Sequence, residues 1–273
     1  MVNSPKDPKM KSHTNEMFYQ LIALLLAVIV VHAIFVTVVR PNAESTIRHH
    51  AEMAAAGEDY QVPRSFFIVI KDFEQEACFI LMFWALAIMG YKTRSALREQ
   101  KMFSTPLISI TEGSRVLPED ASQLARPLQS LPDDQRPLLL PRALQTALTR
   151  FQVTDSVQSA TEAVNTVCSN ENDRLDSELS MVRYITWAIP SIGFIGTVRG
   201  IGAALGQAHE AMQGNIAGVT SSLGVAFNST FIALLISMVV MFFMHQLQLI
   251  QERLVLDSHD YCDNHLLRFL KAK

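Results

Sequence analysis

The strongest hydropathy pattern is a pair of long apolar runs near the C-terminal end, residues 183–207 and 222–246. Each is long enough to span a membrane, because a spanning helix needs roughly 20 apolar residues to cross about 30 Å of hydrocarbon. Both runs also carry many glycine, serine and threonine residues, which is typical of membrane helices that pack closely on other helices. The connecting residues 208–221 are too few to hold a domain, so they predict a turn between two antiparallel spans.

The N-terminal third contains two further apolar runs, residues 17–39 and 66–91. The first is too long for a signal peptide and no small-x-small cleavage site follows it, so it predicts a transmembrane helix that Arg40-Pro41 ends. The second has its unbroken apolar part only from Ala77. It predicts a helix that begins near residue 66 and has a charged turn at the membrane surface, formed by Lys71, Asp72, Glu74 and Glu76.

Basic residues orient these spans. Residues 1–16 contain three lysines, and a basic cluster follows the second run directly: Lys92, Arg94, Arg98 and Lys101. By the positive-inside rule both segments are cytoplasmic. The loops at 40–65 and 208–221 are then periplasmic, and both chain termini lie inside.

The cytoplasmic residues 92–182 and 247–273 carry a different pattern. Six prolines between residues 104 and 141 predict an irregular connection with short helical turns, because proline breaks helices. From Arg142, apolar residues recur at three- and four-residue steps, apart from one gap of six and one of eight. This predicts one long amphipathic helix that continues into the third span. Leucines among charges after residue 247 predict a second, antiparallel helix.

Composition excludes several functions. The chain has 273 residues, 49% of them hydrophobic, and a formal net charge of −3, so nothing indicates nucleic-acid binding. Its three cysteines form no CxxC pair and predict no metal site or cofactor. No motif supplies a catalytic nucleophile or base, so an enzyme is not predicted.

The polar residues of the last two spans are candidate functional residues. In the third span, Gly193, Gly196 and Gly200 are expected to pack against other helices, and Thr197 is the one hydroxyl on the face of small residues that Gly193 and Gly200 share. A threonine in a membrane helix usually hydrogen-bonds to its own backbone, which is the competing interpretation. The fourth span offers Asn228, Ser229 and Thr230, and Asn228 must face protein or water. One threonine on each of two helices is a plausible lining for a narrow ion path.

Charged and titratable residues in the spans are few. Neither of the last two spans contains an aspartate or glutamate, so the titrating carboxylate of an ion path would have to come from another chain. Arg199 lies two positions after Thr197, on a different face. It is expected to snorkel, to form a structural ion pair or to bind a lipid headgroup, rather than to transport. His32 in the first span is expected to face protein rather than to relay protons.

Two segments resemble a known family. GFIGTVRGI, which contains Thr197, resembles the GxxGTVxGI signature of the MotA/TolQ/ExbB proton-channel family. AFNSTFIALLIS, which contains Thr230, resembles the final-helix segment of that family. The resemblance covers about residues 180–250, and Thr197 and Thr230 match the pore threonines of the family. Four spans resemble the MotA layout, whereas TolQ and ExbB have three.

The resemblance implies an all-α integral membrane protein of the bacterial inner membrane, with four transmembrane helices and long cytoplasmic helical extensions. It implies a pentameric ring around a dimer of a single-span partner similar to ExbD, TolR or MotB. The membrane aspartate of that partner would carry H⁺ or Na⁺ past the threonines and so drive mechanical work. Three residues depart from the family pattern, Arg199 and the adjacent pair Asn228-Ser229. The alternative is a passive membrane scaffold whose glycines and serines only pack helices.

Overall fold

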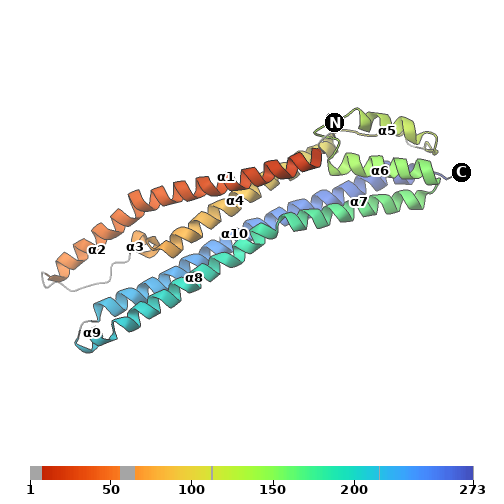
Figure 1. The fold of residues 1–273 in the computed structure, drawn as a ribbon. Helices are drawn as coiled ribbons and strands as arrows, with labels where there is room; N and C mark the ends of the chain where they lie inside the picture. Colours follow the sequence, from red (N-terminus) through yellow and green to blue (C-terminus); the bar gives the residue numbers. More distant parts are fainter. Residues whose placement is uncertain (1–7, 56–64, 112, 215, 273) are drawn as a thin grey trace, which may run out of the picture. The chain divides into compact units, whose positions relative to one another are not determined.

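The computed structural model describes residues 8–55, 65–111, 113–214 and 216–272, and these are almost entirely helical (Figure 1). The elements in order are α1 (Pro8–Ile34), the π-helical turn η1 (Phe35–Val39), α2 (Arg40–Ala55), α3 (Phe66–Ile70), α4 (Phe73–Gln100), η2 (Lys101–Ser104), α5 (Ala121–Gln129), α6 (Leu139–Thr154), α7 (Val157–Glu178), α8 (Ser180–Gly206), α9 (Ala208–Met212), α10 (Ala217–His265) and η3 (Leu267–Phe269). The described residues form one isolated β-bridge, between Val116 and Leu270. The predicted all-α class is confirmed.

Four stretches of described helix are, by length and composition, candidates to cross a membrane, and one falls at each of the four predicted spans. They are Glu16–His49, Phe73–Ser104, Val157–Gly206 and Ala217–Phe269. The chain divides into two compact units. Unit 1 comprises Met1–Met89 and Met181–Met244, and unit 2 comprises Gly90–Ser180 and His245–Lys273.

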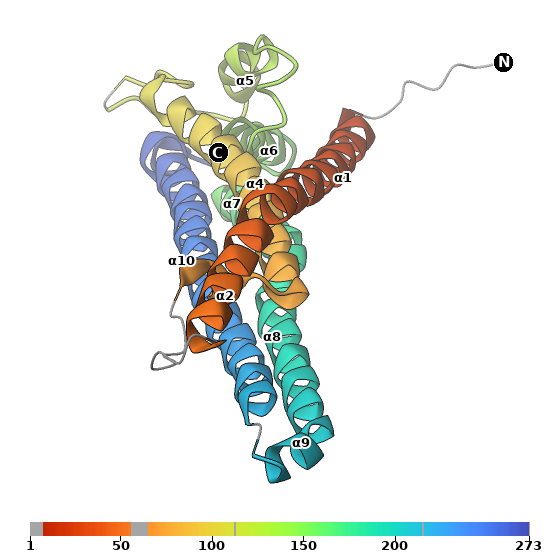
Figure 2. The same ribbon diagram turned by 90° about the vertical axis from the view of Figure 1, so that its left-hand side faces the viewer.

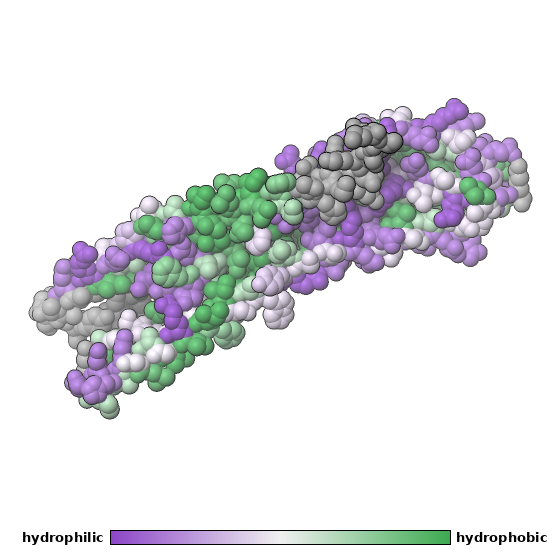
Figure 3. Space-filling view, viewed as in Figure 1, coloured by the Kyte–Doolittle hydropathy of each residue, from purple (hydrophilic) through white to green (hydrophobic). Residues whose placement is uncertain are grey.

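Unit 1 buries small residues and exposes large apolar ones. Within it, α8 and the first half of α10 lie side by side and antiparallel, joined through α9 (Figures 1 and 2). The buried positions include Gly193, Gly196 and Ala226, whereas Trp187 and Phe194 are 72% and 61% exposed. The apolar side chains gather on the visible face of unit 1 (Figure 3). Such a surface suits contact with lipid.

The first span differs from its prediction at its end. Arg40-Pro41 does not end the helix, which continues through η1 and α2 to Ala55. A π-helical turn, with its i to i+5 hydrogen bonds, relaxes the backbone directly before Pro41. Pro41 lies in the turn that follows, and the first turn of a helix tolerates a proline because its N–H needs no intrahelical partner there. The prediction of a helix end at this position was therefore wrong.

The second span begins with a break. The predicted continuous helix from residue 66 is interrupted at Lys71 and Asp72, between α3 and α4. The side chain of Gln75 donates a hydrogen bond over 3.1 Å to the carbonyl oxygen of Val69, and so satisfies a backbone acceptor left free where α3 ends. The charged residues that follow the break are buried in unit 1 and form no exposed surface turn: Glu74 is 9% and Glu76 is 6% exposed.

Unit 2 has a closed apolar core formed by α5, α6, α7 and the end of α10. The predicted single amphipathic helix from Arg142 is two helices, α6 and α7, which pack on each other. Asp155 adopts a left-handed conformation (φ 49°) that ends α6, and the Ser156 side chain accepts a hydrogen bond from the Ser159 N–H to begin α7. The break coincides with the six-residue gap in the apolar pattern. Leu144, Leu148, Phe151 and Leu266 are almost fully buried in this core.

Candidate functional site

The closest approach of α8 and α10 depends on three glycines. A Cβ at Gly193 would lie 2.5 Å from the Cβ of Ala233, and one at Gly196 would lie 2.4 Å from the Cβ of Ser229. At Gly200 it would lie 2.7 Å from the backbone nitrogen of Ala226. Real Cβ atoms are not found at such distances, so any larger residue would push the two helices apart.

Two other glycines of α8, Gly202 and Gly206, behave differently. A Cβ at either of them would meet nothing within 4 Å. Of the two GxxxG pairs in α8, Gly196/Gly200 therefore lies at the contact with α10, and Gly202/Gly206 does not lie at a contact in the described part of the chain. The pattern of glycines thus marks one close helix contact, centred on the turn that holds Thr197.

The structure brings the two candidate threonines together at this contact. The hydroxyls of Thr197 and Thr230 are within hydrogen-bond contact of each other. Thr197 Oγ1 also lies 3.3 Å from the carbonyl oxygen of Gly193 and 3.2 Å from that of Ala226. Thr230 Oγ1 lies 3.1 Å from the same Gly193 oxygen. Both side chains are partly exposed.

The hydroxyl pair can exchange its hydrogen bonds without any change of backbone. Each hydroxyl has one proton to donate and two lone pairs that accept. If Thr197 donates to Thr230, then Thr230 donates to Gly193; if Thr230 donates to Thr197, then Thr197 is free to donate to Gly193 or Ala226. Back-bonding to the own helix, the competing interpretation for Thr197, is therefore present as one of several arrangements. A pair of this kind can solvate a passing cation through its oxygens.

The two neighbours of Thr230 differ in environment. Ser229 is buried (1% exposed) and donates a hydrogen bond over 2.8 Å to the carbonyl oxygen of Val225. It also accepts a longer hydrogen bond, 3.4 Å, from the amide of Gln75 in α4. The side chain of Asn228 is half-buried and has no hydrogen-bond partner among the described residues. Ser229 thus belongs to the packed interior of unit 1, whereas Asn228 is free to meet a group from outside it.

Arg199 forms a two-point ion pair with Glu74 of α4. Its Nε donates to one carboxylate oxygen over 2.6 Å, and its Nη2 donates to the other over 2.8 Å. Among the alternatives open from the sequence, the structure therefore shows an ion pair with a carboxylate. Glu74 was missed as a site residue because its partner is 125 positions away. The one signal for it was a pair of glutamates two positions apart directly before an apolar run.

A second ion-pair cluster lies on the opposite side of α4. Glu76 accepts from His32 Nδ1 of α1 over 2.6 Å, and it also binds Arg40 of α2. His32 thus faces a protein carboxylate, although 58% of its side chain is exposed in the single chain. Because Glu74 and Glu76 are two positions apart on a helix, their side chains point to different neighbours, α8 and α1.

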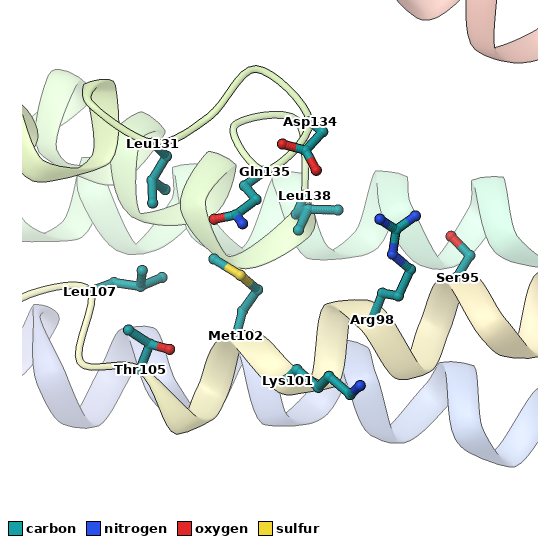
Figure 4. Close-up of a pocket in the computed structure, with 10 residues that line it drawn as sticks. All are labelled: Ser95, Arg98, Lys101, Met102, Thr105, Leu107, Leu131, Asp134, Gln135 and Leu138. Atoms are coloured by element: carbon teal, nitrogen blue, oxygen red, sulfur yellow. The ribbon is translucent and has the colours of Figure 1, made fainter.

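Unit 2 holds ion pairs and a groove that the sequence did not predict. Lys92 is buried and bonded to Glu178 over 2.8 Å. Arg98 and Lys101 of the predicted basic cluster line a groove of about 430 Å³ between the end of α4 and the residues before α6 (Figure 4). Its other lining residues are Ser95, Met102, Thr105, Leu107, Leu131, Asp134, Gln135 and Leu138. It contains no residue of the threonine site.

Comparison with known protein families gives a match over the segment that contains the site. Residues 133–259 match the family model described as the MotA/TolQ/ExbB proton channel family. The match contains both threonines and extends beyond the resembling segments into α6, α7 and the end of α10. No curated protein and no solved structure matches the chain.

Proposed function

We propose, from the match of residues 133–259 to the MotA/TolQ/ExbB proton channel family, that the chain is the ring-forming subunit of an ion-driven motor. Five copies surround two copies of a single-span partner similar to ExbD, TolR or MotB in the inner membrane, with both termini in the cytoplasm. The transported ion is H⁺ or Na⁺, and its flow is converted into mechanical work. The observation that carries this proposal is the contact between the Thr197 and Thr230 hydroxyls at the closest approach of α8 and α10.

The chemistry of the hydroxyl pair assigns its role. Threonine oxygens accept and donate hydrogen bonds, but at neutral pH they do not store a proton. They can therefore solvate the ion while a carboxylate of the partner carries it. The two glutamates that α4 brings into unit 1 are already held by cations, Glu74 by Arg199 and Glu76 by Arg40. A membrane aspartate on the partner fills the remaining role.

The first test removes one hydroxyl without changing side-chain volume. Thr197→Val and Thr230→Val are each expected to reduce ion flux into proteoliposomes of the co-purified complex by at least about tenfold, since a hydroxyl that solvates the ion is lost. Thr220→Val is the matched control, because the Thr220 hydroxyl is on the same helix and bonds to its own backbone at Ile216. Normal flux in both Thr197→Val and Thr230→Val would contradict the assigned path.

The second test addresses the alternative, a passive scaffold. Native mass measurement of the complex in mild detergent is expected to give five copies of this chain with two copies of a small single-span protein. A lone oligomer, with no dependence of its activity on the membrane potential, would favour the scaffold. In both cases we expect no enzymatic activity, because the matching family is described as one of proton channels.

A further inference from the structure

We infer that Glu74 is a positioning residue of the ion path: it neutralises Arg199 beside the threonine pair and thereby sets the affinity of the path for cations. This inference rests on the proposed function. Its first support is the geometry of the pair. The carboxylate of Glu74 takes two hydrogen bonds from the guanidinium, 2.6 Å and 2.8 Å long. Two parallel bonds fix the orientation of an arginine as well as its charge.

The second support is where Glu74 lies. A Cβ at Gly196 would be 3.2 Å from Cγ of Glu74, so the stem of the glutamate packs against the residue directly before Thr197. The same Gly196 position faces Ser229, the residue directly before Thr230. Glu74 thus enters unit 1 at the level of the hydroxyl pair, from a third helix.

The third support is the polar character of this layer. Gln75, beside Glu74 in the sequence, is 1% exposed and reaches Ser229 through its amide nitrogen. Its amide oxygen is buried and has no partner among the described residues. Buried acceptors of this kind are ordinarily paired with a donor. The polar side chains beside the threonines, Gln75 and Ser229, can therefore hydrogen-bond to a further donor. A contact that only packs two helices would be lined by apolar atoms.

Electrostatics gives the pair its function. Arg199 lies two residues beyond Thr197, about 3 Å further along the helix axis. It points to a different face, so it acts on an ion at Thr197 only through its field. Coulomb interactions reach further in a medium of low polarity than in water. Without Glu74, the Arg199 guanidinium would repel a cation in the path. Without Arg199, the Glu74 carboxylate would bind the cation and slow its release. The ion pair leaves the path close to neutral.

The test compares single and double neutralisation. In proteoliposomes of the co-purified complex, flux is measured against external H⁺ and, separately, Na⁺ concentration. Glu74→Gln is expected to raise the half-saturating cation concentration about tenfold, because it removes the carboxylate that binds the arginine directly. Arg199→Met is expected to lower that concentration, and Glu74→Gln/Arg199→Met to return it to within about twofold of the parent. Glu76→Gln is the matched control, since it removes a carboxylate of the same helix turn that faces α1, and it should leave the value unchanged.

A purely structural role gives the opposite pattern for the double variant. If the pair only ties α4 to α8, both single variants reduce the amount of assembled complex, the double variant is no better, and the half-saturating concentration stays constant. That result would overturn the inference while the parent complex still conducts. A parent complex that carries neither cation would instead refute the proposed function itself.

Discussion

Units 1 and 2 are built on opposite packing rules. In unit 1, α8 and α10 meet through glycine, alanine, serine and threonine, and large apolar side chains such as Phe194 point outward. In unit 2, large side chains such as Phe151 are fully buried and the surface is largely polar. The difference follows from the solvent: in water, apolar burial holds helices together, whereas in lipid close contact and hydrogen bonds must do so. Removing a large apolar side chain should therefore destabilise unit 2 more, whereas adding atoms at a helix contact should destabilise unit 1.

The largest expected effect distinguishes two phenylalanines. Phe151→Ala in unit 2 is expected to destabilise that unit by about 3–5 kcal/mol, because it opens a cavity in a closed core. Phe194→Ala in unit 1 removes the same atoms from a position that is 61% exposed in the chain. It should cost less than about 1 kcal/mol in detergent. Hydrogen exchange resolved by segment measures both, and equal losses in the two units would contradict the comparison.

The second prediction adds a methyl group where unit 1 has no room for one. Gly200→Ala is expected to destabilise the contact of α8 with α10 by about 1–3 kcal/mol, although alanine is the better helix former. The new Cβ would lie 2.7 Å from the backbone of Ala226. Gly202→Ala is the control, since its Cβ meets nothing within 4 Å. In thermal unfolding in detergent, Gly200→Ala should have a lower Tm than the parent, and Gly202→Ala a higher one.

A third prediction concerns a buried charge of unit 2. Glu171 is 2% exposed and binds both Arg142 and Arg174. Glu171→Gln is expected to cost about 1–3 kcal/mol, less than for a fully buried pair, because both arginines are partly exposed. Asp133→Asn, which breaks an exposed pair with Arg136, should cost at most about 0.5 kcal/mol. Urea unfolding followed by exchange in α6 and α7 would show the difference, and comparable losses would count against it.

The smallest effect tests the turn between α6 and α7. Ser156→Ala removes the side chain that accepts from the Ser159 N–H over 3.2 Å. The loss is expected to be about 1 kcal/mol, as for other N-cap residues. Ser159→Ala, within the first turn of α7, keeps the backbone donor and should be neutral or slightly stabilising. Proteolysis near residue 155 offers a direct measure, since a weakened cap should speed cleavage in Ser156→Ala alone.

Sequence patterns predicted the elements of this fold better than their ends. Four apolar runs identified four helices, because the length and hydropathy of such a run predict a helix whatever the rest of the fold is. The helix end predicted at Arg40-Pro41 was wrong because a π-helical turn accommodates the proline, and no residue preference marks such a turn. The turn between α6 and α7 was visible as the six-residue gap after Phe151, but Asp155 is not a glycine, the residue that most clearly marks a positive φ.

The residues of the candidate site were likewise identified only in part. Thr197 and Thr230 were identified from local motifs, and the structure places their hydroxyls in contact; their role in conduction remains a prediction. Glu74 was not identified, because its role follows from an ion pair with Arg199, which is 125 positions away in the sequence. Local patterns reveal the residues of one helix face. They do not reveal which distant charge a fold brings to it.

The π-helical turn Phe35–Val39 also corrects a rotational register. His32 and Arg40 are eight residues apart, so in a regular α-helix they would point about 80° apart. One additional residue in a turn rotates the rest of the helix back by about 100°. The two side chains then differ by only about 20°, and both reach Glu76. If the same residues formed a regular α-helix instead, Arg40 would turn off that face, so the π-helical turn acts as an angular spacer that lets one carboxylate bind side chains from two turns of the same helix.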